Sequence, residues 1–119
     1  MAPKALRCRA SCFSVALTAG GSGSAYCAEG YNHFSIRELL RPLEQTAILC
    51  GMTYLPPFAL FGARTAVEEG RIAAHVADWT RLLGALRDDR LDLKRAVSLP
   101  RLNVDLDMII RPPLAPEEV

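Results

Sequence analysis

The sequence predicts an α/β fold built on a parallel sheet, and three observations lead to this prediction. A short apolar run at residues 12–17 is followed by three glycines, as expected for a buried strand that ends in a loop. Two motifs of the Ser/Thr-x-x-Glu type precede stretches in which apolar residues recur at helical spacing. A second apolar run, residues 52–62, lies between these stretches. The order strand, helix, strand, helix is typical of a βαβα unit with right-handed crossovers.

The first helix is predicted to begin after Ser35, whose hydroxyl can accept from the Glu38 N–H while the Glu38 carboxylate bonds back. Apolar residues follow at helical intervals as far as Cys50, which we interpret as a core residue, and Gly51 is a suitable C-terminal cap. Pro42 lies inside this stretch, and an interior proline costs about 3 kcal/mol. We therefore expect a bend just before Pro42 or a new helical start there.

Residues 52–62 suit a strand, but Pro56 and Pro57 cannot donate ladder hydrogen bonds, which places this strand at a sheet edge or on a bulge. The second motif, from Thr65 to Glu68, is expected to open the clearest helix of the chain. We interpret His75 on this helix as a solvated or boundary residue. The apolar residues of the helix form one stripe that we expect to pack on the sheet: Ile72, Val76, Trp79, Leu83 and Leu86.

Two strands make no stable sheet, so we expect the chain to pair with another copy or piece, or to be the end of a larger fold. We assign residues 12–90 to the α/β unit and leave residues 1–11 unassigned. Residues 91–110 are predicted to be a weaker helix or a docking arm, and the proline-rich residues that follow a mobile tail. Basic residues before the first apolar run imitate a secretion signal, but the run is short and continues into the glycine-rich motif.

The composition narrows the class of protein. With 119 residues, of which 50% are hydrophobic and 23% charged, the chain has room for one folded domain. A formal charge of +1 offers no basic excess for nucleic acid, and no apolar run reaches the roughly 18 to 20 residues that span a bilayer. Four irregularly spaced cysteines and two histidines specify neither a zinc site nor a disulfide framework, so we expect reduced thiols and a cytoplasmic location.

The stretch from Thr18 to Tyr26 is rich in glycine and serine and follows the first predicted strand. Ligands of open α/β sheets bind at the carboxyl ends of the strands, which is where this loop lies. Its glycines would let the backbone approach a flat ligand and expose N–H donors, and Tyr26 adds a phenol. The loop lacks the spacing of a Walker or a dinucleotide-binding motif. By itself it indicates either a ligand-binding loop or a plain connection.

Three blocks of the sequence, taken together in order and spacing, resemble the C-terminal half of the NAD(P)H:quinone oxidoreductase family. They are Leu17-Thr-Ala-Gly-Gly-Ser-Gly-Ser-Ala-Tyr26, Arg41-Pro-Leu-Glu-Gln-Thr-Ala-Ile-Leu-Cys-Gly51 and Tyr54-Leu-Pro-Pro-Phe58. The likeness runs from about Val15 to Leu86 and is strongest to the ancillary flavoproteins of glutathione-regulated potassium efflux antiporters. It implies a flavodoxin-like, parallel three-layer sandwich, a homodimer, bound FMN or FAD, and hydride transfer from NAD(P)H through the flavin to a quinone-like acceptor.

The resemblance also implies roles for individual residues. Tyr26 matches the family tyrosine that lines the hydride-accepting face. A histidine that follows it six residues later in the animal-type enzymes is replaced here by Asn32, and the adjacent His33 is either the partner of Tyr26 or a surface histidine beside the helix cap. Ala19 departs from the family pattern and lacks one hydroxyl. The positions that match the family's flavin contacts are Thr18, Ala19, Gly20 and Gly21.

The family implies one absence as well. Its members begin with a strand and a loop that hold the flavin phosphate, and we expect this part to be missing here because the chain is a truncated or partial form. The function that the resemblance implies is NAD(P)H-dependent quinone reduction. The alternatives are a regulatory ancillary subunit of a potassium antiporter, peripheral at the inner face of the membrane, and an inactive remnant of either.

Overall fold

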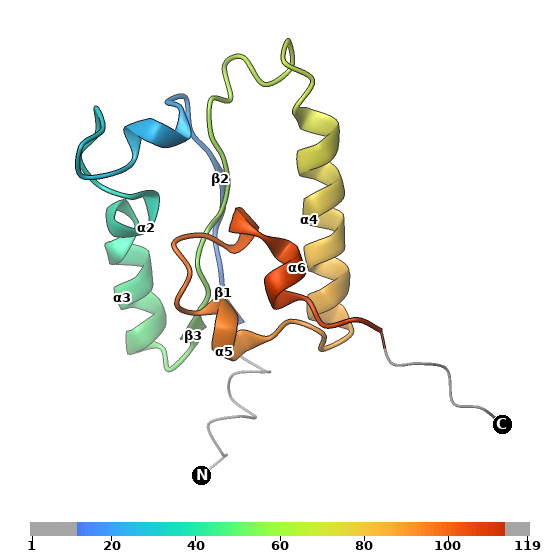
Figure 1. Ribbon diagram of the computed structural model, residues 1–119. Helices are drawn as coiled ribbons and strands as arrows, with labels where there is room; N and C mark the ends of the chain where they lie inside the picture. The colour runs from blue at the N-terminus through green and yellow to red at the C-terminus, as the bar shows by residue number, and fades with distance from the viewer. Residues whose placement is uncertain (1–11, 114–119) are drawn as a thin grey trace, which may run out of the picture.

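The computed structural model describes residues 12–113, so the expectations for residues 1–11 and for the tail beyond residue 113 lie outside the described part. Figure 1 shows the described chain as a set of short strands with helices beside them. The strands are β1 (Cys12–Phe13), β2 (Ala16–Thr18), β3 (Thr53–Tyr54) and β4 (Phe58–Leu60). The α-helices are α2 (Ile36–Leu39), α3 (Arg41–Leu49), α4 (Ile72–Arg87), α5 (Leu93–Ala96) and α6 (Leu106–Ile109). The 3₁₀ turns are η1 (Gly23–Ala25) and η2 (Leu102–Val104).

The strands pair in parallel, as the sequence predicts. β1 pairs with β3, and β2 pairs with β4, where Leu17 lies opposite Ala59. Pro56 and Pro57 lie between the two pairs and are fully buried. Because neither proline has an N–H, the ladder is interrupted there, and the Ser14 hydroxyl bonds the Pro56 carbonyl at 3.1 Å. The two prolines thus divide one predicted strand into β3 and β4.

The first helical stretch confirms its sequence signals. Ser35 and Glu38 form the reciprocal capping box at the start of α2. The helix breaks at Leu40, and α3 begins with Pro42 in its first turn, where the missing N–H costs nothing. Gly51, with φ of 72°, follows the end of α3 in the left-handed conformation of a C-terminal cap. The prediction for Cys50 is wrong, because the residue is exposed just after the end of α3, and the residue that α3 buries fully is Ala47.

The second capping motif does not open a helix, so this prediction is wrong. The chain makes a turn after Thr65 that ends at Gly70, whose φ is 69°, and the Arg71 N–H bonds the Ala66 carbonyl at 2.9 Å. The Thr65 hydroxyl bonds the Glu69 carboxylate at 2.7 Å and caps no helix. A left-handed glycine ends a helical turn, so α4 begins afresh at residue 72.

The face by which α4 packs also differs from the predicted stripe. The residues of α4 that are fully buried are Leu82 and Ala85. The ring of Phe58 in β4 lies 5.1 Å from Trp79, which packs on the core as predicted, and 4.7 Å from His75, which is half-buried at the boundary as predicted. This face meets β4 and the C-terminal part of the chain, and no described element covers the rest of the stripe. The stripe residues that stay exposed are Ile72, Val76, Leu83 and Leu86.

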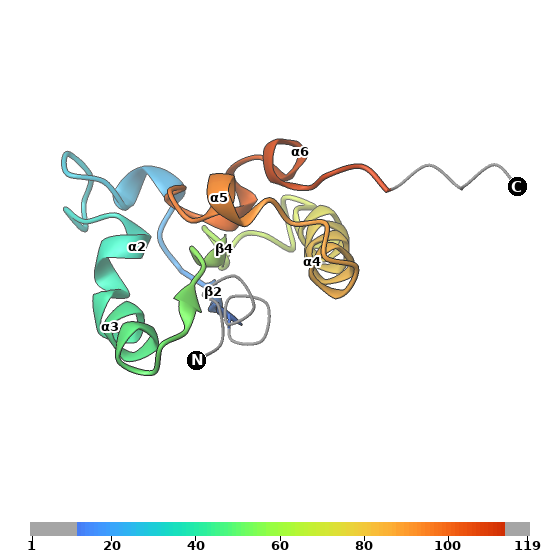
Figure 2. The same ribbon diagram turned by 90° about the horizontal axis from the view of Figure 1, so that it is seen from below.

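Residues 91–110, which we call the C-terminal arm, form short helical segments (α5, η2 and α6) instead of one helix, and they complete the core. Figure 2 shows α3 and α4 on opposite sides of the strands and the arm beside β4. Apolar burial is the main favourable contribution to folding, so the arm is an integral part of this fold. The residues of the core cluster that come from the arm are Leu91, Ala96, Leu102, Leu106, Ile109 and Ile110.

The arm also closes one edge of the sheet. The Asn103 side-chain amide accepts from the Ala59 N–H at 3.1 Å and donates to the Ala59 carbonyl at 2.7 Å. The Leu102 N–H bonds the Pro57 carbonyl at 2.8 Å on the same edge. Asn103 therefore supplies the two hydrogen bonds that a further strand would give to β4. Within residues 12–113, no strand pairs with the other edge of β2.

Candidate functional site

The glycine-rich loop, residues 18–26, lies at the carboxyl ends of β2 and β4, as the position of the motif predicts. Three backbone hydrogen bonds tie it to the last residue of β4 and to the loop that follows β4. The Ala19 N–H bonds the Leu60 carbonyl at 2.9 Å, the Ala63 N–H bonds the Ala19 carbonyl at 3.0 Å, and the Gly62 N–H bonds the Gly21 carbonyl at 2.8 Å. Backbone hydrogen bonds on both sides hold the loop in one conformation, so its free groups have fixed directions.

Two glycines of this region are required by close approach. A Cβ on Gly21 would lie 3.2 Å from the hydroxyl oxygen of Tyr26, tighter than ordinary van der Waals contact. A Cβ on Gly30 would lie 2.3 Å from the Ser24 carbonyl oxygen, which is too close for any side chain. Gly21 thus lets Tyr26 fold back over the loop, and Gly30 lets the next turn return onto η1.

The residues that match the family's flavin contacts are accessible. Thr18 and Gly20 are exposed, and Ala19 and Gly21 are half-buried. Among residues 12–113, no acceptor bonds the backbone N–H of Gly20 or Gly21. Backbone donors without a protein partner are available to a ligand, and glycine leaves them unshielded by a side chain. These two N–H groups are among the donors that the loop can offer to a flat, polar ligand.

Tyr26 packs against an aromatic residue from the neighbouring strand end. Its ring centroid lies 5.2 Å from that of Phe61, with an angle of 31° between the planes. Phe61 directly follows β4, and Gly23 lies against the same ring. Aromatic pairs at this separation attract each other beyond the effect of area burial alone. The two rings form a small aromatic platform, Tyr26–Phe61, next to the free donors of the loop.

A hollow of 330 Å³ lies between the glycine loop and the loop after β4. Arg71 holds the loop after β4 in place on one side of this hollow, since the Arg71 guanidinium donates to the Phe61 and Gly62 carbonyls at 2.7 Å each. Hydrogen bonds from Thr65 and Arg71 lower the pKa of Glu69, so this carboxylate is anionic and already paired. The hollow is lined by Ser22, Gly23, Phe61, Gly62, Thr65, Glu69 and Arg71.

His33 is placed beside the same loop but is not brought onto Tyr26. It is exposed, its φ is 63°, and its backbone N–H bonds the Gly30 carbonyl at 3.1 Å. Its neighbour Asn32 contacts the residue before Tyr26, because the Asn32 N–H bonds the Ala25 carbonyl at 2.9 Å. No contact within the described residues joins the His33 side chain to Tyr26. Its role as partner of Tyr26 stays a prediction.

Two residues near the loop were missed by sequence reasoning. Phe61 could have been found, because the carboxyl ends of neighbouring parallel strands meet at one place. Arg101, whose guanidinium lies 5.1 Å above the Phe61 ring, could not. It comes from the C-terminal arm, and no local pattern announces where an irregular arm docks.

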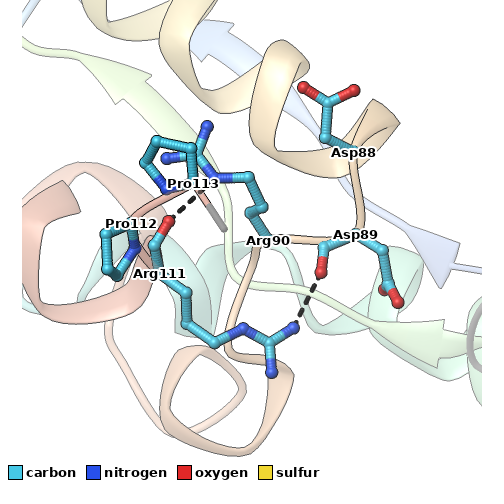
Figure 3. Close-up of a pocket in the computed structure, with 6 residues that line it drawn as sticks. All are labelled: Asp88, Asp89, Arg90, Arg111, Pro112 and Pro113. Atoms are coloured by element: carbon cyan, nitrogen blue, oxygen red, sulfur yellow. Dashed lines mark hydrogen bonds between the residues drawn. The ribbon is translucent and has the colours of Figure 1, made fainter. Parts of the chain in front are cut away.

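A larger hollow, 540 Å³ in volume, lies at the far end of α4 and is separate from the glycine loop. Figure 3 shows that its arginines are already engaged: Arg90 donates to the Arg111 carbonyl at 2.9 Å, and Arg111 donates to the Asp89 carbonyl at 2.8 Å. These bonds close the turn between α4 and the end of the arm. Residues 12–113 hold no group of three or more His, Cys, Asp or Glu side chains placed to bind a metal.

Similar proteins cover the same part of the chain. Two relatives come from Bacillus subtilis: General stress protein 14 is 44% identical over 55 residues, and the uncharacterized NAD(P)H oxidoreductase YdeQ is 46% identical over 55 residues. Each match covers 46% of this chain, with 31% and 28% of the respective relative. The glutathione-regulated potassium-efflux system ancillary protein KefG of Serratia proteamaculans is 38% identical over 68 residues, covering 55% of this chain and 37% of that protein.

Comparison with solved structures and with protein families agrees with the fold. A chain in the crystal structure of a thermophilic tryptophan halogenase (Th-Hal) from Streptomycin violaceusniger superposes with a TM-score of 0.54 and 41% identity, covering 57% of this chain and 39% of that one. This chain spans about a third of the length of the curated relatives it matches. Residues 9–83, more than half of the chain, match the family described as having the flavodoxin-like fold. The chain therefore belongs to the flavodoxin-like fold family, as its three sequence blocks predict.

Proposed function

We propose that this chain carries the ring-facing and acceptor-facing part of an NAD(P)H-dependent flavin oxidoreductase of the quinone reductase type. The observation that carries this proposal is the fixed glycine loop, whose free Gly20 and Gly21 N–H groups lie beside the Tyr26–Phe61 platform. A relative that is named an NAD(P)H oxidoreductase supports the class of reaction.

The residues present fit a flavin. Thr18, Ala19, Gly20 and Gly21 would hold its polar edge, because two unshielded N–H donors and an exposed threonine suit the oxygens and nitrogens of an isoalloxazine ring. FMN or FAD bound there would supply the hydride chemistry between NAD(P)H and the acceptor. The protein's part is to orient the ring and to stabilise charge on it, which backbone N–H groups do without a titrating side chain.

Tyr26 would act on the acceptor. Its hydroxyl lies over the glycine loop. The ring packs on Phe61, and Gly21, which has no Cβ, leaves room for the hydroxyl. From this position the phenol would donate a hydrogen bond to an acceptor oxygen such as that of a quinone, and so orient the acceptor. His33 would contribute a second donor after a change of its side-chain position.

Within residues 12–113, no strand pairs with the edge of the sheet beside the site. The open edge of β2 borders the glycine loop, and the matched part of this chain covers 31% and 37% of two of its relatives. We propose that a second copy of the chain, as a homodimer, or a separate piece pairs there.

The direct test is quinone reduction by the FMN-supplemented chain with NADH and with NADPH. Tyr26→Phe removes the hydroxyl and keeps the ring stacked on Phe61, so kcat/KM should fall by at least about tenfold, the effect of roughly one lost hydrogen bond. Tyr31→Phe is the matched control, because Tyr31 lies in the same loop region and is 88% exposed. Equal turnover of both variants and the unaltered chain would remove Tyr26 from the mechanism.

A second candidate function is favoured by the KefG relatives, which are named as ancillary proteins of a potassium-efflux system. In that role the chain would bind a potassium antiporter from the cytoplasm, peripherally at the inner face of the membrane. No helix of the described part is long and apolar enough to span a membrane. Co-purification with such an antiporter and a change in potassium efflux would support this role, and a failure of both would remove it.

A further inference from the structure

Arg101 is held by the C-terminal arm next to Phe61, one of the residues of the glycine-loop site. Its backbone is extended, with φ of −159°, and the next residue, Leu102, is fully buried and bonds the Pro57 carbonyl through its N–H. The arm therefore anchors the Arg101 backbone beside Pro57, the residue before β4. The guanidinium lies 5.1 Å above the ring of Phe61. A cation over an aromatic face is attracted to it, which favours this position of the side chain.

The guanidinium has at least one donor that the described residues do not use. Its Nε is buried and has no hydrogen-bond partner, and no carboxylate within residues 12–113 pairs with it. Buried polar groups are nearly always satisfied, so each exception calls for a partner that is not yet present. A charged donor of this kind is costly to leave unpaired, and an anion is the partner that suits it best.

The surroundings of Arg101 are those of a ligand site with positive charge. Phe61 also contacts Tyr26, so the guanidinium and the acceptor-facing phenol share one ring. Arg64, whose side chain passes 3.5 Å from the Cβ position of Gly20, forms no ion pair within the described residues either. The Glu69 carboxylate, which lines the same hollow as Phe61, is already paired with Arg71.

We propose that Arg101 binds an anionic group of the ligand that stacks on the Tyr26–Phe61 platform, and that it thereby selects charged over neutral ligands. This inference rests on the proposed function, which places an acceptor or a nicotinamide dinucleotide at this platform. A phosphate of the dinucleotide and an acidic substituent of the acceptor present the same chemistry, anionic oxygens in reach of a planar, forked donor. Arg101 is thus a binding residue that sets specificity.

The test compares three probes on the full chain by titration calorimetry: NADP⁺, a naphthoquinone sulfonate, and the same naphthoquinone without the sulfonate. Arg101→Gln should raise the dissociation constant of one anionic probe by about tenfold, since a charge-assisted hydrogen bond is lost. The neutral naphthoquinone should bind within about twofold of its original affinity. Which anionic probe responds identifies the source of the anion.

Two further variants separate binding from structure. Lys94→Gln removes one exposed positive charge from the same arm and should leave all three affinities unchanged. Arg101→Lys keeps the charge and should restore part of the lost affinity, with a dependence on salt concentration that the Gln variant lacks. The inference is overturned if the unaltered chain binds neither anionic probe, or if Arg101→Gln lowers only the thermal stability. A failure of the unaltered chain to bind FMN would instead contradict the proposed function, whatever Arg101 does.

Discussion

The two edges of the β2–β4 sheet are finished in different ways. On the β4 side, the C-terminal arm packs six residues into the core, and Asn103 bonds both backbone groups of Ala59. On the β2 side, no described strand continues the sheet, and a hollow of 370 Å³ opens between β2 and α4. Figure 2 shows the arm beside β4, with β2 lying away from it.

The difference indicates which side of the molecule is complete. A side chain that imitates a strand is a way to end a sheet, whereas an unpaired edge with apolar surface next to it invites another strand. The exposed stripe of α4, with Val76 53% and Leu83 45% accessible, continues this apolar surface. The β4 side therefore carries the stability of the described fold, and the β2 side, with the glycine loop at its end, is where we propose that a partner pairs.

The largest expected effect is on the closed side. Leu102 is 0% exposed in the core, so Leu102→Ala should lower the free energy of unfolding by about 2 to 5 kcal/mol. Leu83→Ala makes the same chemical change on the open side, where the side chain is 45% exposed, and should cost no more than about 1 kcal/mol. Chemical denaturation of both variants measures the difference. Equal losses would show that the core does not lie where the arm meets α4.

A smaller effect is expected at the edge itself. Asn103→Ala leaves the Ala59 N–H and carbonyl without partners, which should cost about 1 to 3 kcal/mol. Amide exchange at Ala59 should accelerate in this variant, while exchange at Leu55, whose N–H bonds the Phe13 carbonyl, should change little. Unchanged exchange at Ala59 would mean that Asn103 does not close this edge.

The smallest change in stability is expected on the open side, together with a change in assembly. Val76→Gln replaces an exposed apolar side chain by a polar one and should alter the free energy of unfolding by no more than about 0.5 kcal/mol. If this surface pairs with a second copy, sedimentation velocity should show less dimer for Val76→Gln than for the unaltered chain. A monomeric unaltered chain, or an unchanged dimer fraction, would remove the open side from self-association.

The sequence predicted local features better than it predicted how distant segments pack on one another. The capping box at Ser35, the new start at Pro42 and the left-handed Gly51 were predictable because each depends on a few neighbouring residues. The Thr65 motif misled because Gly70 ends its turn, although the motif has the right residues. The wrong placement of Cys50 has a related cause, since helical spacing does not say which face of a helix is covered.

The candidate site likewise has one part that the sequence predicted and one part that it could not predict. The position of the glycine loop followed from the strand before it, and the resemblance supplied the roles proposed for Thr18 to Gly21 and for Tyr26. The contribution of the arm could not be predicted, because Arg101 reaches Phe61 from forty residues further along an irregular segment. Contacts of that range depend on tertiary packing and leave no periodic pattern in the sequence.

The central claim is that the glycine loop contacts a flavin, and FMN titration of the full chain followed by flavin fluorescence tests it most directly. Gly21→Ala would place a methyl group 3.2 Å from the Tyr26 hydroxyl and disturb the loop, whereas Gly84→Ala places one in open space. We predict saturable FMN binding, weakened about tenfold by Gly21→Ala and unaffected by Gly84→Ala, consistent with roughly one lost hydrogen bond. Absence of FMN binding to the unaltered chain, or equal affinity of all three proteins, would contradict the claim.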